Sequence, residues 1–227
     1  MKKILKRLYH KLQWINSIKK IDFIYYNYLC KRVLRDKEVY IIPYKGAIID
    51  IHRTAKIELH GQNLNIGINK IGKSRAETYV KMEKEAYWKC NNGASLCYGG
   101  NIEIHDNGCL ETNSFFLNVG SVIIATKRIE LGEDVWIGRD CVIYDSDFHW
   151  MLDENGNVRN VSKPVKVGNH VWLTNHVMIQ KGVEIGANVV ICPHTIVRKN
   201  ISEGKMIASG TTQICVADDI KWSSELI

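Results

Sequence analysis

Aliphatic residues recur at every sixth position through the C-terminal third of the chain. One series runs from residue 167 to residue 197, and a second series follows four residues behind it. An α-helix repeats about every 3.6 residues and a half-buried strand every second residue, so neither explains two series held in step. A hexapeptide β-helix does, because each side of its triangular coil is one short strand and one turn. The two series are Val167, Leu173, Ile179, Ile185, Ile191 and Val197, and Val171, Val177, Val183, Val189, Thr195 and Ile201.

Three hexapeptides close one coil, so residues 18 apart should stack at about the 4.8 Å spacing of paired strands. The first series should point inward from short strands, with the second near the corners. Tight turns are expected at Gly168, Gly182 and Gly186, since glycine tolerates conformations that other residues avoid. His176 and His194 should then stack on one outer face, with the side chain of His170 one side of the triangle away.

The same spacing continues upstream with a slip. It predicts a bulge between residues 124 and 129, and a looser version of the pattern extends back to residue 48. We therefore predict an all-β fold, a parallel β-helix of hexapeptide repeats over residues 48–202, followed by a C-terminal tail at 203–227. The inward positions predicted upstream are Ile104, Leu110, Phe116 and Val122, and then, three residues out of step, Leu131, Ile137 and Ile143.

Residues 1–47 form a basic extension with helical spacing of apolar residues. Two amphipathic helices are predicted, one around residues 5–15 and one around residues 21–28, with Lys and Arg on the polar faces. One interpretation is a cap that covers the exposed end of the first coil. The other is a helix that lies on a membrane surface.

The formal net charge is +7, and much of the positive charge falls in the first 35 residues. No nucleic-acid-binding motif accompanies it, so we expect no nucleic-acid partner. A solvated helix face, an anionic membrane surface and a phosphorylated substrate all fit. The seven cysteines form no Cys-x-x-Cys pair, and the N-terminus has neither a signal-peptide core nor a membrane-spanning run. We expect a cytoplasmic protein, with the inner face of the membrane as one place for it.

The repeat stops between Ile143 and Val167, and a segment at residues 144–166 intrudes. Solenoids accommodate insertions as loops that project from one face, and binding and catalysis concentrate in such loops. This one contains Asp147-x-His149. Imidazole titrates near neutral pH, which suits a general base.

The stretch Ile-Tyr-Asp-Ser-Asp-Phe-His-Trp, followed by Val-Gly-Asn-His-Val-Trp-Leu, resembles the hexapeptide-repeat acyltransferases. It looks most like the bacterial O-acetyltransferases of capsule, O-antigen and exopolysaccharide pathways. The resemblance covers about residues 100–202, and an Asp-Ile-Lys-Trp ending at 219–222 echoes the family. It implies a left-handed β-helix, although parallel crossovers are generally right-handed. It also implies acetyl-CoA as co-substrate and a sugar or polysaccharide acceptor.

The resemblance assigns catalysis to His149 as general base in a direct transfer without an acyl-enzyme. Asp147 could orient the imidazole or serve only as a turn residue. Trp172 matches a family tryptophan. It could donate its indole N–H to the oxyanion, or it could form an apolar wall beside the pantetheine arm. Asp145, Trp150 and Arg139 are the candidates for acceptor binding.

By the same resemblance, acetyl-CoA lies along the C-terminal coils. Asn175 falls beside the thioester arm, and Arg198 and Lys199 fall near the phosphates. Pro193 stands where relatives offer an amide N–H, and proline has none. The histidine spacing does not match a zinc site of the hexapeptide carbonic anhydrases, so no metal is expected.

Family members pack three coil stacks side by side, which implies a homotrimer with active sites between subunits. The leading hypothesis is an acetyl-CoA-dependent sugar O-acetyltransferase in surface-polysaccharide assembly. Two alternatives remain: N-acetylation of an amino sugar on a nucleotide carrier, and a β-helix scaffold without catalysis. The identity of the acceptor would distinguish N-acetylation from O-acetylation. A loop at residues 144–166 without a catalytic role would indicate the scaffold.

Overall fold

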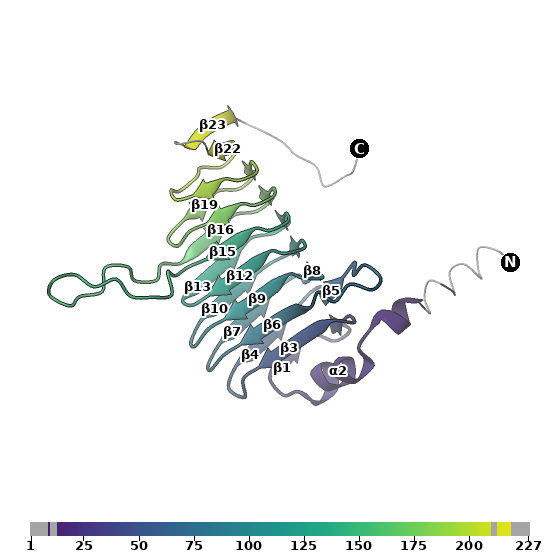
Figure 1. The fold of residues 1–227 in the computed structure, drawn as a ribbon. Coiled ribbons are helices and arrows are strands. Elements are labelled where there is room, and N and C mark those ends of the chain that lie inside the picture. The colour runs from purple at the N-terminus through teal and green to yellow at the C-terminus, as the bar shows by residue number, and fades with distance from the viewer. Residues whose placement is uncertain (1–8, 10–12, 210–212, 219–227) are drawn as a thin grey trace.

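The chain winds into one triangular solenoid of three parallel sheets (Figure 1). The computed structural model describes residue 9 and residues 13–209 and 213–218. From β1 to β21 successive strands visit the three sheets in turn, and strands a full coil apart pair in parallel. The fold is a left-handed parallel β-helix, which confirms the predicted class.

The first sheet contains β1 (Val33–Arg35), β4 (Lys56–Leu59), β7 (Tyr87–Cys90), β10 (Cys109–Thr112), β13 (Arg128–Leu131), β16 (Val165–Val167) and β19 (Glu184–Ile185). The second contains β2 (Ile41–Pro43), β5 (Leu64–Ile68), β8 (Ala94–Cys97), β11 (Phe115–Leu117), β14 (Val135–Ile137), β17 (Trp172–Leu173), β20 (Val190–Ile191), β22 (Lys205–Ser209) and β23 (Gln213–Asp218). The third contains β3 (Ala47–Ile51), β6 (Thr78–Met82), β9 (Asn101–Ile104), β12 (Val122–Ala125), β15 (Val142–Tyr144), β18 (Met178–Ile179) and β21 (Ile196–Val197).

The core is a single column of aliphatic side chains that runs the length of the solenoid. Both series predicted from residue 167 onward lie in it, and all twelve side chains are buried, which confirms the repeat. Each coil covers the inward face of the previous one. Burial of a leucine or isoleucine side chain stabilises a fold by about 1.5–3 kcal/mol, so this column supplies most of the stability.

Two upstream inward positions were wrong. Phe116 and Val122 point outward, and their neighbours Phe115, Leu117 and Ile123 fill the core instead. No bulge lies between residues 124 and 129, because β12 and β13 pair with their neighbours in unbroken register. The cause is coil length. Tyr79 pairs with Asn101, a turn of 22 residues, so six-residue spacing does not hold there.

The residues with a positive φ at the corners of the coils are not all the glycines that were predicted there. Gly182 has a φ of +76°, as expected, but no positive φ occurs at Gly168 or Gly186. The left-handed corner residues of the last coils include His170, His176 and His194. Gly168 is required for space instead, since a Cβ there would lie 2.7 Å from the carbonyl carbon of Gly186. The rings of His176 and His194 stack with centroids 4.6 Å apart, which confirms that prediction.

The coils begin at β1 and β2, earlier than residue 48, and a helical cap covers them (Figure 1). Residues 13–17 are helical, α2 spans Lys20–Ile24 and a π-helical turn, η1, spans Tyr25–Leu29. The buried Asn27 accepts a hydrogen bond from Ile41 N and donates one to Ile41 O. Tyr26 donates its hydroxyl to Ile49 O. These bonds satisfy the exposed edge of the first coil, which is the capping role.

At the other end β22 extends the second sheet in parallel with β20, and β23 folds back antiparallel onto β22. The solenoid therefore continues past residue 202. The predicted helix positions up to residue 8, and residue 12, lie outside the described residues, as does the Asp-Ile-Lys-Trp ending.

Candidate active site

The interruption in the repeat is a long projecting loop between β15 and β16 (Figure 1). It leaves the corner where the third sheet passes to the first. The loop adds residues without disturbing the coils, because Val142 of β15 still pairs with Met178 of β18. Its apolar side chains are largely exposed; they are Phe148, Trp150, Met151, Leu152 and Val161.

Asp145 anchors the base of the loop. Its side chain is fully buried, and Oδ1 accepts hydrogen bonds from both N and Oγ1 of Thr126 at 2.7 and 2.8 Å. Oδ2 accepts from the backbone N–H groups of Lys127 and Arg128 at 2.7 and 2.6 Å. Because these four donors occupy both oxygens, the geometry gives Asp145 a structural task that holds the 126–128 turn.

Asp147 ties the loop to the C-terminal coils. Its Oδ2 lies 2.6 Å from Lys181 Nζ and accepts from Asn160 Nδ2 at 3.1 Å. Lys181 also donates to Asn160 O at 2.9 Å, which closes a three-residue clasp. The hydrogen bond from Lys181 is the largest cause that lowers the pKa of Asp147 below its usual range, so the carboxylate stays charged at neutral pH.

His149 stands just outside this clasp with its side chain exposed. Its backbone is held on both sides, since N donates to Asp147 O at 2.7 Å and O accepts from Asn160 Nδ2 at 2.7 Å. The preceding Phe148 has a φ of +63°, an uncommon conformation for a bulky residue. Asp147 thus fixes the backbone that presents His149, while its carboxylate is directed to Lys181 rather than to the imidazole.

Trp172 lies on the second sheet, which is the side of the triangle opposite the loop corner. Its side chain is 39% exposed, and it pairs in register with Trp136 of β14. Trp136 donates Nε1–H to Asp134 Oδ1 at 2.7 Å. The structure therefore does not bring His149 and Trp172 of one chain together.

The residues expected to hold acetyl-CoA lie on the outside of the C-terminal coils. Asn175, Pro193, Arg198 and Lys199 are all exposed. The Asn175 side chain accepts a hydrogen bond from Arg139 N at 3.0 Å, so it supports the turn of the preceding coil. Arg139 and Trp150 are exposed, the latter at 78%.

Among the described residues, no group of three or more His, Cys, Asp or Glu side chains could hold a metal ion. The cysteines of the described chain are free thiols. Burial raises the pKa of Cys90 to about 11 and also raises the pKa of Cys192. A raised pKa keeps a thiol protonated and unreactive, which fits packing rather than nucleophilic roles.

Two functional candidates escaped the sequence analysis. Lys181 and Asn160 complete the clasp on Asp147, but they lie 34 and 13 residues from it along the chain. Only one signal pointed to Lys181: a charged residue stands in a corner position of an otherwise regular repeat. Asn160 carried none.

Residues 164–199 match the profile of the bacterial transferase hexapeptide family (six repeats). The matched residues include strands β16 to β21 of the C-terminal coils.

Two O-acetyltransferases share sequence with parts of this chain, and one solved structure is similar to most of it. The chain is 40% identical over 65 residues to a polysialic acid O-acetyltransferase of Neisseria meningitidis, a match covering 28% of this chain. It is 29% identical over 132 residues to the galactoside O-acetyltransferase of Escherichia coli (strain K12), covering 55% of this chain. These matches span 30% and 61% of the lengths of the two relatives. The crystal structure of the polysialic acid O-acetyltransferase OatWY aligns with a TM-score of 0.61 and 25% identity, over 86% of this chain and 92% of that chain.

None of the described helices is both long and apolar enough to cross a membrane.

Proposed function

We propose that the protein transfers an acetyl group from acetyl-CoA to a sugar hydroxyl during the assembly of a bacterial surface polysaccharide. The single observation that carries this proposal is the clasped loop, which is tied to the C-terminal coils by Asp147 and fixes the backbone of the exposed His149. The names of the relatives, both of which are O-acetyltransferases, support the reaction class.

In the proposed mechanism His149 removes the proton of the acceptor hydroxyl as its oxygen attacks the acetyl carbonyl carbon. The C–S bond of the thioester then breaks, and the imidazolium returns its proton to the departing thiolate. The products are the acetyl ester and free CoA. A positioned general base contributes typically about 10²–10⁴-fold in rate. Trp172 is proposed to donate to the oxyanion, worth about 3 kcal/mol, or to wall the donor arm.

The donor is proposed to lie along the C-terminal coils, with Arg198 and Lys199 near its phosphates and Asn175 beside the thioester arm. Exposed cations on this surface fit an anionic nucleotide. Trp150 and Arg139 stay candidates for contacts with the acceptor. Asp145 is no longer proposed for that role, because its four hydrogen bonds leave it no free oxygen lone pair toward solvent.

We also propose a homotrimer in which the loop of one subunit reaches the second sheet of its neighbour. His149 and Trp172 lie on opposite sides of one coil stack, so they can share a site only across two copies. The exposed apolar side chains of the loop, such as Trp150 and Leu152, support burial against a partner.

The N-terminal cap supports the proposal of a cytoplasmic protein at the inner face of the membrane. Its exposed side chains include Ile21 at 83% and Leu29 at 66%, close in sequence to Lys19, Lys20 and Lys31. Apolar residues next to basic ones favour an anionic lipid surface. The full chain should co-sediment with anionic vesicles and not with neutral ones, and Ile21→Ser should weaken that binding. Equal recovery with both vesicle types would contradict the membrane proposal.

The activity is tested with the purified full chain, acetyl-CoA and a panel of sugar and amino-sugar acceptors, with free thiol and acetylated product as readouts. His149→Ala should reduce O-acetyl transfer by at least about 100-fold with unchanged thermal stability. His194→Ala is the matched control, since His194 lies on the outer face of the last coil. A His149→Ala variant that turns over normally excludes the base assignment. Acetylation confined to amino groups would replace O-transfer with N-transfer.

A further inference from the structure

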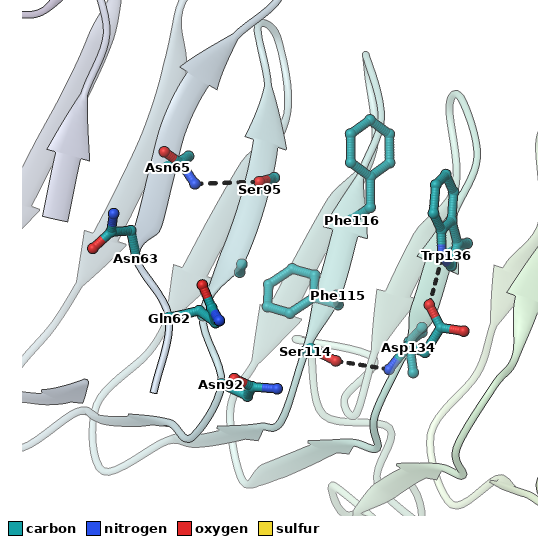
Figure 2. Close-up of a pocket in the computed structure, with 13 residues that line it drawn as sticks. Gln62, Asn63, Asn65, Asn92, Ser95, Ser114, Phe115, Phe116, Asp134 and Trp136 are labelled. Carbon is teal, nitrogen blue, oxygen red and sulfur yellow. Dashed lines mark hydrogen bonds between the residues drawn. The ribbon is translucent and has the colours of Figure 1, made fainter. Parts of the chain in front are cut away.

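One line of outward side chains crosses the second sheet from β5 to β17. The parallel register aligns each residue with the next, so the line is set by the ladder itself. It changes from polar to aromatic toward the proposed active site, as Figure 2 shows for its first part. In strand order the residues are Asn65, Ser95, Phe116, Trp136 and Trp172.

A pocket of about 340 Å³ opens on this line between β5 and β14. Phe116 and Trp136 border it on one side. Amide, hydroxyl and carboxylate side chains border it along the adjoining turns (Figure 2), namely Gln62, Asn63, Asn92, Ser114 and Asp134. The pocket is shallow and wide, which suits an extended chain that lies across it better than a small molecule enclosed by it.

The aromatic side of the pocket is held in place before any ligand arrives. Asp134 Oδ1 accepts from the Trp136 indole at 2.7 Å, and Asp134 Oδ2 lies 2.6 Å from His170 Nδ1. The Asp134 backbone N–H donates to Ser114 Oγ at 2.8 Å. Phe116 packs beside Trp136 with ring centroids 5.4 Å apart and planes inclined by 30°. A rigid platform loses little conformational entropy on binding.

The polar side has hydrogen-bonding capacity to spare. Gln62 and Asn92 are exposed, and neither side-chain amide makes a hydrogen bond within the described part of the chain. Each amide offers two donors and an acceptor. Planar amides opposite an aromatic face suit a sugar ring, which has apolar C–H faces and hydroxyls around its edge.

The charge of the pocket selects among sugars. None of the described residues that line it is Lys or Arg, and its one charged side chain is the carboxylate of Asp134. A sialic or uronic acid would bring a carboxylate, for which proteins usually provide arginine. An anionic glycan would therefore meet the carboxylate of Asp134 and no lysine or arginine among the described residues that line the pocket.

We infer that this pocket is an acceptor subsite for a neutral glycan chain, which stacks on Phe116 and Trp136 and hydrogen-bonds to Gln62 and Asn92. The inference rests on the proposed function, because it assumes that acetyl transfer takes place beside Trp172, where the line of outward side chains ends. Trp136 and Trp172 are strand neighbours about 4.8 Å apart, so a glycan on the pocket continues directly to the proposed site. The four strand spacings from Asn65 to Trp172 span roughly 19 Å, enough for a short oligosaccharide.

The test is a titration of tryptophan fluorescence in the full chain without acetyl-CoA. The probes are oligosaccharides of uncharged hexoses (malto-, cello- and galacto-oligosaccharides) and oligosialic acid of equal length. At least one neutral series should quench fluorescence and oligosialic acid should not. Phe116→Ala should weaken neutral binding about tenfold, which corresponds to about 1.4 kcal/mol. Tyr87→Ala, an outward aromatic on the first sheet, is the matched control and should bind normally.

A charge-reversing variant sharpens the assignment. Asn92→Lys should gain affinity for oligosialic acid and lose affinity for the neutral series. Preference of the unaltered protein for oligosialic acid, failure of every neutral probe to bind, or full binding by Phe116→Ala would each overturn the inference. Neutral binding that depends on Phe116, in a protein that transfers no acetyl group, would retain the subsite and refute the proposed function instead.

Discussion

The coils before the loop and the coils after it both stack strands around a buried core, but they differ in the number of residues per coil. In β6 and β9 the strands have five and four residues, and Tyr79 pairs with Asn101 across 22 residues. In β17 to β21 the strands have two residues, and Lys166 pairs with Glu184 across 18. The core after the loop is aliphatic, whereas the core before it also contains Trp88 and Phe115.

The difference shows where a solenoid can carry a binding surface. A three-residue strand such as β14 presents an outward residue between two inward ones, and four- and five-residue strands present two or more. The upstream coils use such positions for Ser95, Phe116 and Trp136, around a pocket. The downstream coils, with the shortest strands, keep a uniform triangular section along which an elongated donor can lie.

The loop enters at the boundary between the two regions. Its base is held by the upstream turn at Thr126, through Asp145, and its arm is held by Lys181 from the downstream coils. His149 is thereby positioned by both regions at once. Three predictions test this comparison.

The largest effect is expected where the regular coils leave no room. Gly168→Ala should destabilise the protein by about 1–3 kcal/mol, because the added Cβ would lie 2.7 Å from Gly186 C and 2.8 Å from Ala187 N. Both contacts are to backbone, which cannot move aside cheaply. Denaturant or thermal unfolding measures the loss.

The matched control lies in the upstream region. Gly72→Ala, in the turn between β5 and β6, should leave stability within about 0.5 kcal/mol, since no atom lies within 4 Å of the added Cβ. Equal losses for the two variants would contradict the claim that the stacked corners of the coils, unlike the long turn at Gly72, leave no room for a Cβ.

A smaller effect is expected at the clasp. Lys181→Met should cost about 1 kcal/mol or less in overall stability, because Asp147 is partly exposed and the ion pair is screened. The rate of acetyl transfer should fall by more than the small loss in the free energy of unfolding explains, since the backbone of His149 is no longer held in place. Transfer rate and limited proteolysis of the loop are the measurements, with Lys166→Met on β16 as control. Normal transfer with a protease-sensitive loop would mean that the clasp does not position the base.

The clasp also sets a pH dependence. The folded pKa of Asp147 lies below its unfolded value, chiefly through Lys181. Its stabilising contribution is therefore complete above the unfolded pKa, near 3.9, and is lost as pH falls through the lower folded pKa. Loop proteolysis should stay slow at neutral pH and rise only in strong acid. In Lys181→Met that rise should begin at a higher pH.

Sequence reasoning succeeded where the repeat was strict and failed where coil length varied. The inward series from Val167 to Val197 and the stacking of His176 on His194 follow from an 18-residue coil. Phe116 and Val122 were misassigned because turns of 20 or more residues shift the phase of a six-residue pattern. The start of the coils at β1 was missed for the same reason.

The residues of the proposed site also divide into those that the sequence revealed and those that only the structure revealed. His149 and its loop were evident because the loop breaks a regular pattern. The partners of Asp147 were not, since Lys181 and Asn160 reach it only after the loop folds back on the coils. Asp145 resembled a site residue in the sequence, yet its burial under four donors gives it a different task.

The order of inward and outward residues by itself determined that this chain forms stacked triangular coils, because no other fold buries two aliphatic series at a period of six. The tertiary structure alone decided which outward side chains become neighbours. Residues a coil apart meet through strand pairing, and the number of residues in that coil is not written in the spacing of any one segment. The aromatic line from Phe116 to Trp172 and the opposite placement of His149 are both consequences of that register.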